Sequence, residues 1–226
     1  MRADHGTAAG QPRTPFNSPP LVRLLAGLDP AAPPAAALSR SSVGERLGQW
    51  LDWTDAIALS QALNQPPTCP PAQAPRAAAR AATALARVRD DLSRAILQEP
   101  VFPADPAQAP ALADVRRAAQ ARQRAMAAAI GPLRAQLRGL LAATSPALAH
   151  LAALDATLES ALGERERHSL SAVVPRLERL FQQRQQAAAP DWRTDFVQTL
   201  HQVLLAELDL RLQPAQGLVD ALGEAA

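Results

Sequence analysis

Apolar residues recur at helical spacing along residues 112–143, and this stretch holds the most regular pattern of the chain. On a wheel of about 100° per residue they share one narrow sector, and they are Leu112, Val115, Ala119, Met126, Ile130, Leu133, Leu137 and Leu140. Arginines fill a different sector. The pattern predicts a long amphipathic helix, and Gly131 and Pro132 in its middle predict a kink.

Further stretches of helical spacing are separated by prolines and capping residues. They predict helices over residues 19–28, 42–63, 76–98, 145–168, 171–188 and 192–212, followed by a short last helix that starts at Pro214. Ser145 is a favourable N-cap before a proline at the first helical position. Ser171 is predicted to cap the next helix, unless Pro175 instead kinks one continuous helix.

Composition supports an all-helical fold. Alanine and leucine dominate the apolar positions, only 3% of the residues are aromatic, and tyrosine is absent. Strands favour β-branched and aromatic residues, whereas helices favour Ala, Leu, Arg, Gln and Glu. The prediction is an all-α protein, a multi-helix bundle with long amphipathic helices and proline-rich linkers.

Proline-rich stretches also predict the domain organisation. A disordered N-terminus over residues 1–18 precedes an N-terminal helical module at 19–63, a proline-rich linker at 64–75 and a helical bundle at 76–226. At 226 residues the chain can bury one sizeable core with an appended module. The module is either separately mobile or folded back onto the bundle or a partner, and its apolar face favours the second reading.

Two of the three tryptophans lie in the predicted helix over residues 42–63. Val43, Leu47, Trp50, Leu51, Trp53 and Ile57 share one arc of its wheel. Arg46 lies at the edge of this arc, where a cation–π contact with Trp50 is possible. The face packs either into the protein's own core or onto a partner, and Arg46, Trp50, Trp53 and Ile57 are the candidate protein-interaction residues.

Arginines line the polar faces of two predicted helices. The stripes comprise Arg76, Arg80, Arg87 and Arg94 on residues 76–98, and Arg116, Arg117, Arg124, Arg134 and Arg138 on residues 112–143. A solvated polar face is the plain interpretation. Because few acids interrupt the second stripe, it is also a candidate for duplex nucleic-acid backbone or for an acidic protein partner.

The charge of the whole chain does not decide among these readings. All 23 basic residues are arginine, and the formal net charge is only +2. A GC-rich genome explains arginine in place of lysine, while the guanidinium fork also suits phosphate and carboxylate recognition. Aromatics do not interleave with the arginines, so base stacking on a single strand is not expected.

No catalytic or metal-binding motif is found in the sequence. Zinc, P-loop, dinucleotide-binding and nucleophile-elbow patterns are all missing. The single cysteine, Cys69, excludes an intrachain disulfide, and the four histidines show no ligand spacing. Glu207 lies in an apolar arc with Arg211 one turn later, so a structural ion pair is expected. The prediction is a non-enzyme without cofactor or metal.

Targeting signals are also missing, and this predicts a cytoplasmic protein without direct membrane insertion. The N-terminal residues lack the apolar segment of a secretory signal. The longest leucine-rich uncharged run, residues 139–154, is too short and too interrupted to span a bilayer. The apolar sector of residues 112–143 could seal a homo-oligomer as well as a monomer core.

Several segments resemble an uncharacterised family of proteobacterial proteins with a domain of unknown function. These are FNSPPLVRLL at Phe16–Leu25, ERLGQWLDWTDAIALSQAL at Glu45–Leu63, SPALAHLAALDATLESALGERER at Ser145–Arg167 and AELDLRLQPAQGLVDAL at Ala206–Leu222. The resemblance implies genes beside those of a MotA-like proton-channel protein and an OmpA-like peptidoglycan-binding protein. That arrangement is similar to type III Zorya anti-phage defence systems, in which cytosolic accessory subunits accompany a membrane motor.

Taken together, the residues and the resemblance predict a non-enzymatic helical adaptor, an accessory subunit of a multi-protein bacterial assembly. Its partners are other protein subunits, including those of a membrane motor in anti-phage defence. The alternative is a duplex nucleic-acid-binding protein that uses the two arginine stripes. No catalytic residues come with the resemblance.

Overall fold

The computed structural model describes residues 19–28, 50–64, 74–98, 100–103 and 109–225. Its helices are α1 (Pro20–Gly27), α3 (Trp53–Asn64), α4 (Ala74–Gln98), α5 (Leu112–Ala142), α6 (Pro146–Leu170), α7 (Val173–Ala187) and α8 (Trp192–Glu224). Within these ranges the chain forms no strand. The predictions made for residues 1–18, for Arg46 and for nearly all of the proline-rich linker at 64–75 lie outside the described residues.

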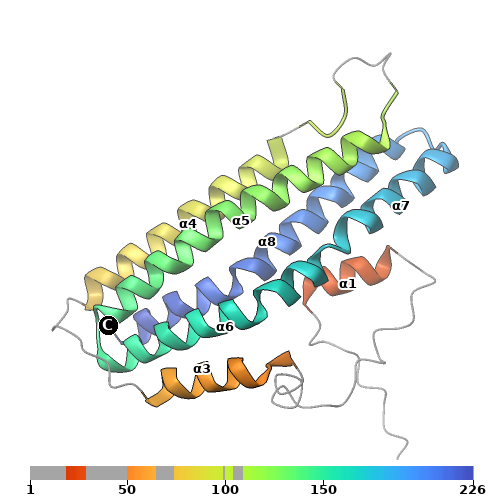
Figure 1. Ribbon diagram of the computed structural model, residues 1–226. Coiled ribbons are helices and arrows are strands. Elements are labelled where there is room, and N and C mark those ends of the chain that lie inside the picture. Colours follow the sequence, from red (N-terminus) through yellow and green to blue (C-terminus); the bar gives the residue numbers. More distant parts are fainter. Residues whose placement is uncertain (1–18, 29–49, 65–73, 99, 104–108, 226) are drawn as a thin grey trace, which may run out of the picture.

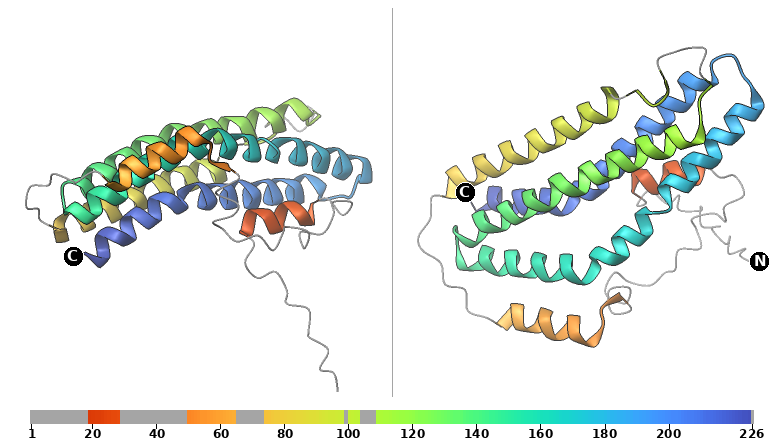
Figure 2. Two further views of the ribbon diagram at one scale, coloured as in Figure 1. Left: turned by 60° about the horizontal axis from the view of Figure 1, so that its bottom comes forward. Right: turned by 45° about the horizontal axis from the view of Figure 1, so that its top comes forward.

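Four antiparallel rods make up the bundle (Figures 1 and 2). Helices α4 and α5 run in opposite directions, α6 and α7 follow one another along a third rod, and α8 returns so that its end lies beside the start of α4. Helix α8 packs against α4, α5 and α7. The prediction of an all-α multi-helix bundle is confirmed.

The two N-terminal helices lie on different parts of this bundle. Helix α1 packs on α8, and Leu21 is buried there. Helix α3 lies outermost and packs on α6 (Figure 2). Both described parts of the predicted module at 19–63 therefore contact the bundle, and they do so through different helices.

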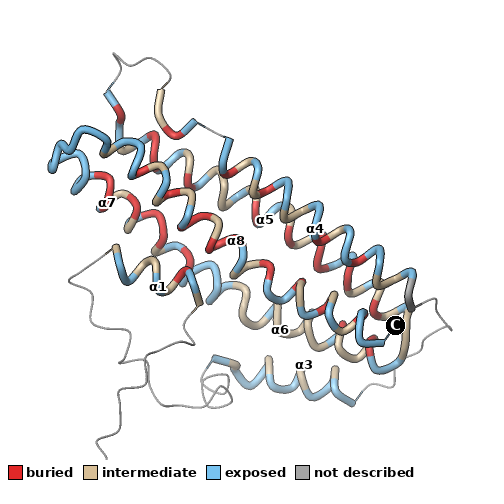
Figure 3. Tube along the Cα trace, turned by 180° about the vertical axis from the view of Figure 1, so that it is seen from behind, coloured by how far each residue is buried: buried red, intermediate tan, exposed pale blue. Residues whose placement is uncertain are grey.

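The core lies between the inner faces of the rods (Figure 3). Helix α8 supplies buried residues at helical spacing along its length, among them Phe196, Leu200, Leu204, Leu208, Leu212, Leu218 and Leu222. Helix α5 supplies most of its predicted apolar sector, including Val115, Ala119, Met126, Leu133 and Leu137. Because burial of each such leucine stabilises the fold by about 1.5–3 kcal/mol, this apolar interior is the main source of stability.

The start of α6 confirms the predicted cap, and the start of α7 corrects the other one. The Ser145 side-chain oxygen accepts a hydrogen bond from the Leu148 amide, and Pro146 opens the helix. Ser171 does not begin α7. It closes α6 instead, and its hydroxyl donates to the His168 carbonyl at 2.6 Å. Pro175 lies in the first turn of α7, where a missing amide hydrogen is tolerated.

The prediction of a separate last helix at Pro214 is wrong, because α8 continues through that proline to Glu224. Proline removes one helical hydrogen bond and crowds the carbonyl one turn earlier. Residues on both sides of it, Leu212 and Ala215, are fully buried, and Leu218 and Leu222 follow on the same face. Burial of this face outweighs the local cost of the proline. Pro132 likewise lies inside α5.

An aromatic cluster ties one end of the bundle together. Phe102 and Phe181 contact each other, and each also contacts Trp192 and Phe196, with ring centroids 5.5–6.3 Å apart. Phe181 comes from α7, Trp192 and Phe196 from α8, and Phe102 from the connection between α4 and α5. The sequence indicated only a proline-rich connection there, yet Val101 is buried and Phe102 packs against the core.

None of the described helices is both long enough and apolar enough to cross a lipid bilayer.

Truncation of the aromatic cluster tests its role. Phe196→Ala removes a ring that is 0% exposed, so the free energy of unfolding should fall by about 3–5 kcal/mol. Urea denaturation followed by circular dichroism measures this change. Leu97→Ala is the control, because Leu97 is 53% exposed and its loss should change stability by less than about 0.5 kcal/mol. A small effect of Phe196→Ala would contradict the cluster as an anchor.

Candidate functional site

Helix α3 places its tryptophan away from the bundle. No residue of the helix is buried, and the half-buried Asp55, Leu59 and Ala62 recur at helical spacing, so this face lies on α6. Trp53 is 82% exposed, and Ile57 is exposed one turn later. The predicted apolar arc is thus divided between a face that covers α6 and a face that meets solvent.

The predicted helix over residues 42–63 is interrupted before Trp53. Leu51 and Asp52 are not helical, and α3 begins after them. The Asp55 amide donates to Asp52 Oδ1 at 2.8 Å, and the Asp52 amide donates to Asp55 Oδ2 at 3.2 Å. This reciprocal pair satisfies two amides that a helix start leaves free, so Asp52 begins a new helix.

A cation–π contact joins the beginning of this segment to α6. The guanidinium carbon of Arg165 lies 5.8 Å from the centroid of the Trp50 ring. The sequence suggested Arg46 for such a contact, but Arg46 is not among the described residues. A contact of this kind contributes about 0.5–1 kcal/mol at an exposed site, so the attachment of α3 is weak compared with the packing of the bundle.

The arginine stripe of α5 is largely paired with acids from neighbouring helices. Arg134 Nη2 lies 2.6 Å from Asp155 Oδ1, and Arg138 Nη1 lies 2.6 Å from Glu159 Oε2. Two further pairs, Arg134–Glu159 at 3.2 Å and Arg138–Asp155 at 2.9 Å, close a four-residue network between α5 and α6. Burial opposes the charge of Arg138, but hydrogen bonds with Glu159 and Asp155 outweigh it and raise the pKa of this guanidinium.

The other end of the same stripe divides between paired and unpaired arginines. Arg116 Nε donates to Glu178 of α7 at 2.5 Å, and this hydrogen bond raises the pKa of the guanidinium. Arg117 pairs with Asp114, one turn earlier, at 2.7 Å. Arg124 is exposed and has no ion-pair partner in the described part of the chain. Glu178 is distant in sequence, and Asp114 lies beside the stripe on the same helix. The helical wheel alone therefore did not show these ion pairs.

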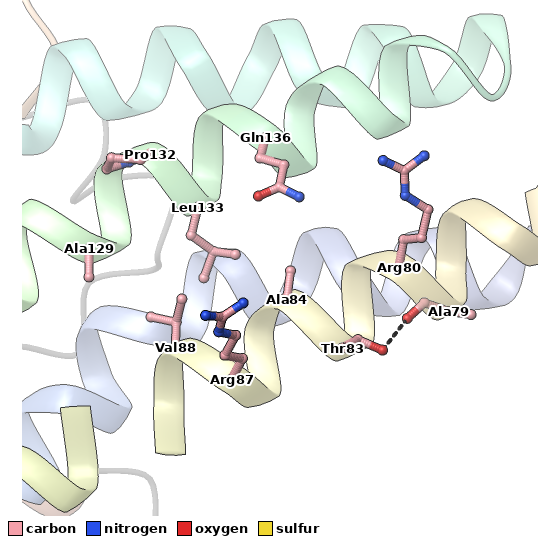
Figure 4. Close-up of a pocket in the computed structure, with 10 residues that line it drawn as sticks. All are labelled: Ala79, Arg80, Thr83, Ala84, Arg87, Val88, Ala129, Pro132, Leu133 and Gln136. Atoms are coloured by element: carbon pink, nitrogen blue, oxygen red, sulfur yellow. Dashed lines mark hydrogen bonds between the residues drawn. The ribbon is translucent and has the colours of Figure 1, made fainter. Parts of the chain in front are cut away.

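The stripe of α4 borders a groove between α4 and α5. Its volume is about 640 Å³. Figure 4 shows Arg80 and Arg87 on α4 with Ala84 between them, while Leu133 and Gln136 reach from α5. The small side chains of Ala84 and its neighbours leave the floor open. The groove therefore combines an apolar floor with two cations about 10 Å apart along the helix axis.

Acids neutralise part of the α4 stripe as well. Asp91 lies 3.1 Å from Arg94 and 3.9 Å from Arg87, and all three side chains are exposed. Arg76 also has an interaction partner. Arg80 has none within the described segments. Binding of duplex nucleic acid stays a prediction, and it now depends on fewer available guanidiniums than the sequence indicated.

The buried carboxylate of α8 is closed to solvent. Glu207 is 0% exposed, and Arg211 donates to its Oε1 from Nη2 at 2.7 Å and from Nε at 2.9 Å. Gln123 of α5 donates to both of its oxygens at 3.1 Å. The predicted ion pair with Arg211 is confirmed, and the sequence did not reveal Gln123. Both carboxylate oxygens accept hydrogen bonds, so this carboxylate is a structural anchor between α5 and α8.

Ligand sets for a metal ion are not found in the described part of the chain, where no three His, Cys, Asp or Glu side chains converge. Cys69 lies outside the described residues.

The chain belongs to the family described as protein of unknown function (DUF3348), which matches residues 8–224. A search of curated proteins and a search of solved structures each found no match. The family assignment confirms that the resemblance is to an uncharacterised family.

The ion network between α5 and α6 can be tested by removing one charge. Arg134 is only 8% exposed, and Asp155→Asn removes one of the negative charges that pair with its guanidinium. The free energy of unfolding should fall by about 1–3 kcal/mol in urea denaturation. The control Asp91→Asn alters a solvent-exposed cluster and should change stability by less than about 0.5 kcal/mol. Equal losses in the two variants would contradict a stabilising network.

Partial burial of the His201 ring should make the free energy of unfolding depend on pH. Desolvation by burial lowers the pKa of His201, and its Nε2 has no hydrogen-bond partner within the described segments. The unfolded chain therefore binds more protons at mildly acidic pH. The contribution of the neutral ring is fully present above about pH 6.5 and is lost as pH falls through the folded pKa. Chemical denaturation at several pH values measures how the free energy of unfolding changes with pH. This change should be smaller in His201→Gln, and an unchanged pH dependence would contradict the prediction.

Proposed function

We propose that this protein is a non-enzymatic helical adaptor that docks a protein partner on the exposed face of α3. The observation that carries the proposal is Trp53, which is 82% exposed at the surface of a chain with few aromatic residues. Tryptophan is enriched among the residues that dominate binding energy at protein interfaces. Ile57 lies beside it on the same face, and Trp50 precedes the helix.

The way α3 is attached supports this function. Its inner face is only half-buried on α6, whereas the four rods hold a continuous core without it. A helix that contributes so little to the core would be free to present a binding surface. The exposed ring of Trp53 can bury a large apolar area on a partner at low cost in side-chain entropy.

A second contact region supports an adaptor with more than one binding surface. The groove between α4 and α5 has the shape and charge to receive an amphipathic helix. Apolar residues of such a helix would meet Ala84 and Leu133, and its carboxylates would meet Arg80 and Arg87. Complementary charges of this kind favour the rate and specificity of association.

The partner in this proposal is a subunit of a bacterial membrane-motor assembly. The resemblance described above implies a MotA-like proton-channel protein as a neighbour, together with a role in anti-phage defence of the Zorya type. An adaptor of this kind would act from the cytoplasm on the part of the motor that faces it. Self-association through the same face of α3 is the competing outcome.

Substitution of Trp53 tests the docking surface. Full-length chain carrying Trp53→Ala should keep the helical content and the unfolding midpoint of the wild type, because the ring lies outside the core. Its affinity for the co-expressed MotA-like protein should fall about 30-fold, the effect of an interface hot spot of about 2 kcal/mol. Co-purification and surface plasmon resonance measure this change.

Leu97→Ala provides the matched control, since Leu97 is also an exposed apolar residue but lies on α4. Binding should be unaffected in this variant. Equal binding of wild type and Trp53→Ala would contradict the proposed surface. Failure of both to bind the MotA-like protein would contradict the proposed partner, and a Trp53-dependent dimer in size-exclusion chromatography would replace that partner with a second copy of the chain.

A further inference from the structure

Helices α5 and α6 face each other in an antiparallel register, and the ion network shows where charges meet. Moving one turn forward along α5, from Arg134 to Arg138, corresponds to moving one turn back along α6, from Glu159 to Asp155. At this end of the seam two cations meet two anions. The same register, continued toward the start of α5, brings Arg124 opposite the C-terminal end of α6.

Toward that end of the seam, arginines line a surface groove that has no carboxylate in its wall. The groove has a volume of about 400 Å³ and is lined by Arg124 of α5, Arg167 of α6 and Arg211 of α8. Polar uncharged side chains, Gln120 and Ser171 among them, complete the wall, and no carboxylate lines it. Three guanidiniums from three helices therefore converge on one concave surface.

Only one of these three cations is neutralised. Arg211 uses Nε and Nη2 to hold the buried Glu207. The guanidinium groups of Arg124 and Arg167 have no hydrogen-bond or ion-pair partner within the described segments. Three positive charges against the single carboxylate of Glu207 leave the groove with a formal charge of +2.

The usual structural reasons account for only part of this arrangement. Arg167 lies in the last turn of α6, where a cation favours the helix dipole. That reason does not apply to Arg124, which lies in the middle of α5. Across the groove Arg124 faces another exposed cation, Arg167. Like charges held close together are unfavourable, and a bound anion would remove this repulsion.

We propose that the groove formed by Arg124, Arg167 and Arg211 binds the phosphate group of a small phosphorylated molecule. Guanidinium forks suit tetrahedral phosphate oxygens, and charge-assisted hydrogen bonds of this kind are about twice as strong as neutral ones. None of the residues that line this groove belongs to α3 or α4. The site therefore does not rest on the proposed adaptor function.

An adjoining groove provides room for the rest of such a ligand. It has a volume of about 410 Å³ and shares Ala127, Arg167 and Arg211 with the first groove. Small residues such as Gly163 leave its floor open, and Arg134, Glu159, Glu164 and Glu166 also line it. Both volumes fall in the range of small-molecule sites. Carboxylates beside a phosphate site favour a ligand that also carries hydroxyl or amino donors, as a nucleotide or a sugar phosphate does.

Isothermal titration calorimetry of the full chain tests the site, with pyrophosphate and ATP as probes at constant ionic strength. Wild type should bind both saturably. Arg124→Gln and Arg167→Gln should each weaken binding about tenfold or more, because each removes one charge-assisted contact. Both side chains are exposed, so helical content and unfolding midpoint without ligand should not change. Arg211 is left intact because it holds Glu207.

Arg193→Gln is the charge-matched control, since Arg193 is an exposed arginine on α8 outside this groove. It should bind both probes as the wild type does. Absence of saturable binding, or an equal loss in Arg193→Gln, would overturn the proposal. Citrate binding as tightly as pyrophosphate would overturn the preference for phosphate, and duplex DNA that displaces pyrophosphate from the wild type but not from Arg124→Gln would assign the groove to a nucleic-acid backbone instead.

Discussion

The buried stripe of α8 is the constraint on which the rest of the structure depends. It runs from Phe196 to Leu222 and contacts the other rods of the bundle as well as α1. In a chain with so few aromatic residues, leucines must supply most of the buried apolar area. That burial holds Pro214 inside a continuous helix, and it places Glu207 where Arg211 and Gln123 donate hydrogen bonds to it.

The seam between α5 and α6 is built differently, and this difference explains the outer position of α3. Helix α6 contributes few buried apolar residues, chiefly Leu148, Ala152 and Leu170. Its inner face is instead held by the ion pairs of Asp155 and Glu159. Half-buried apolar residues remain on its outer side, and α3 covers them incompletely. The same helix therefore joins the bundle to α3, a helix with no buried residue.

Local patterns in the sequence predicted the local parts of this structure. The 3.6-residue period placed the apolar sectors of α4 and α5, and Ser145 with Pro146 marked the start of α6. Interactions between distant segments were not predictable in this way. Phe102 looked like part of a linker because its partners, Phe181 and Phe196, lie far along the chain. The prediction of a separate last helix at Pro214 was wrong for the same reason, since tertiary burial overrides the local preference of proline.

The arginines show why a functional surface cannot be read from one helix alone. On the wheel of α5, Arg124, Arg134 and Arg138 belong to one stripe of equal charge. In the bundle the antiparallel register of α6 gives Arg134 and Arg138 acidic partners, while Arg124 meets another arginine across a groove. The charge available for binding is therefore set by the neighbouring helix. A stripe of arginines becomes a candidate binding site only where no carboxylate of a neighbouring helix pairs with it.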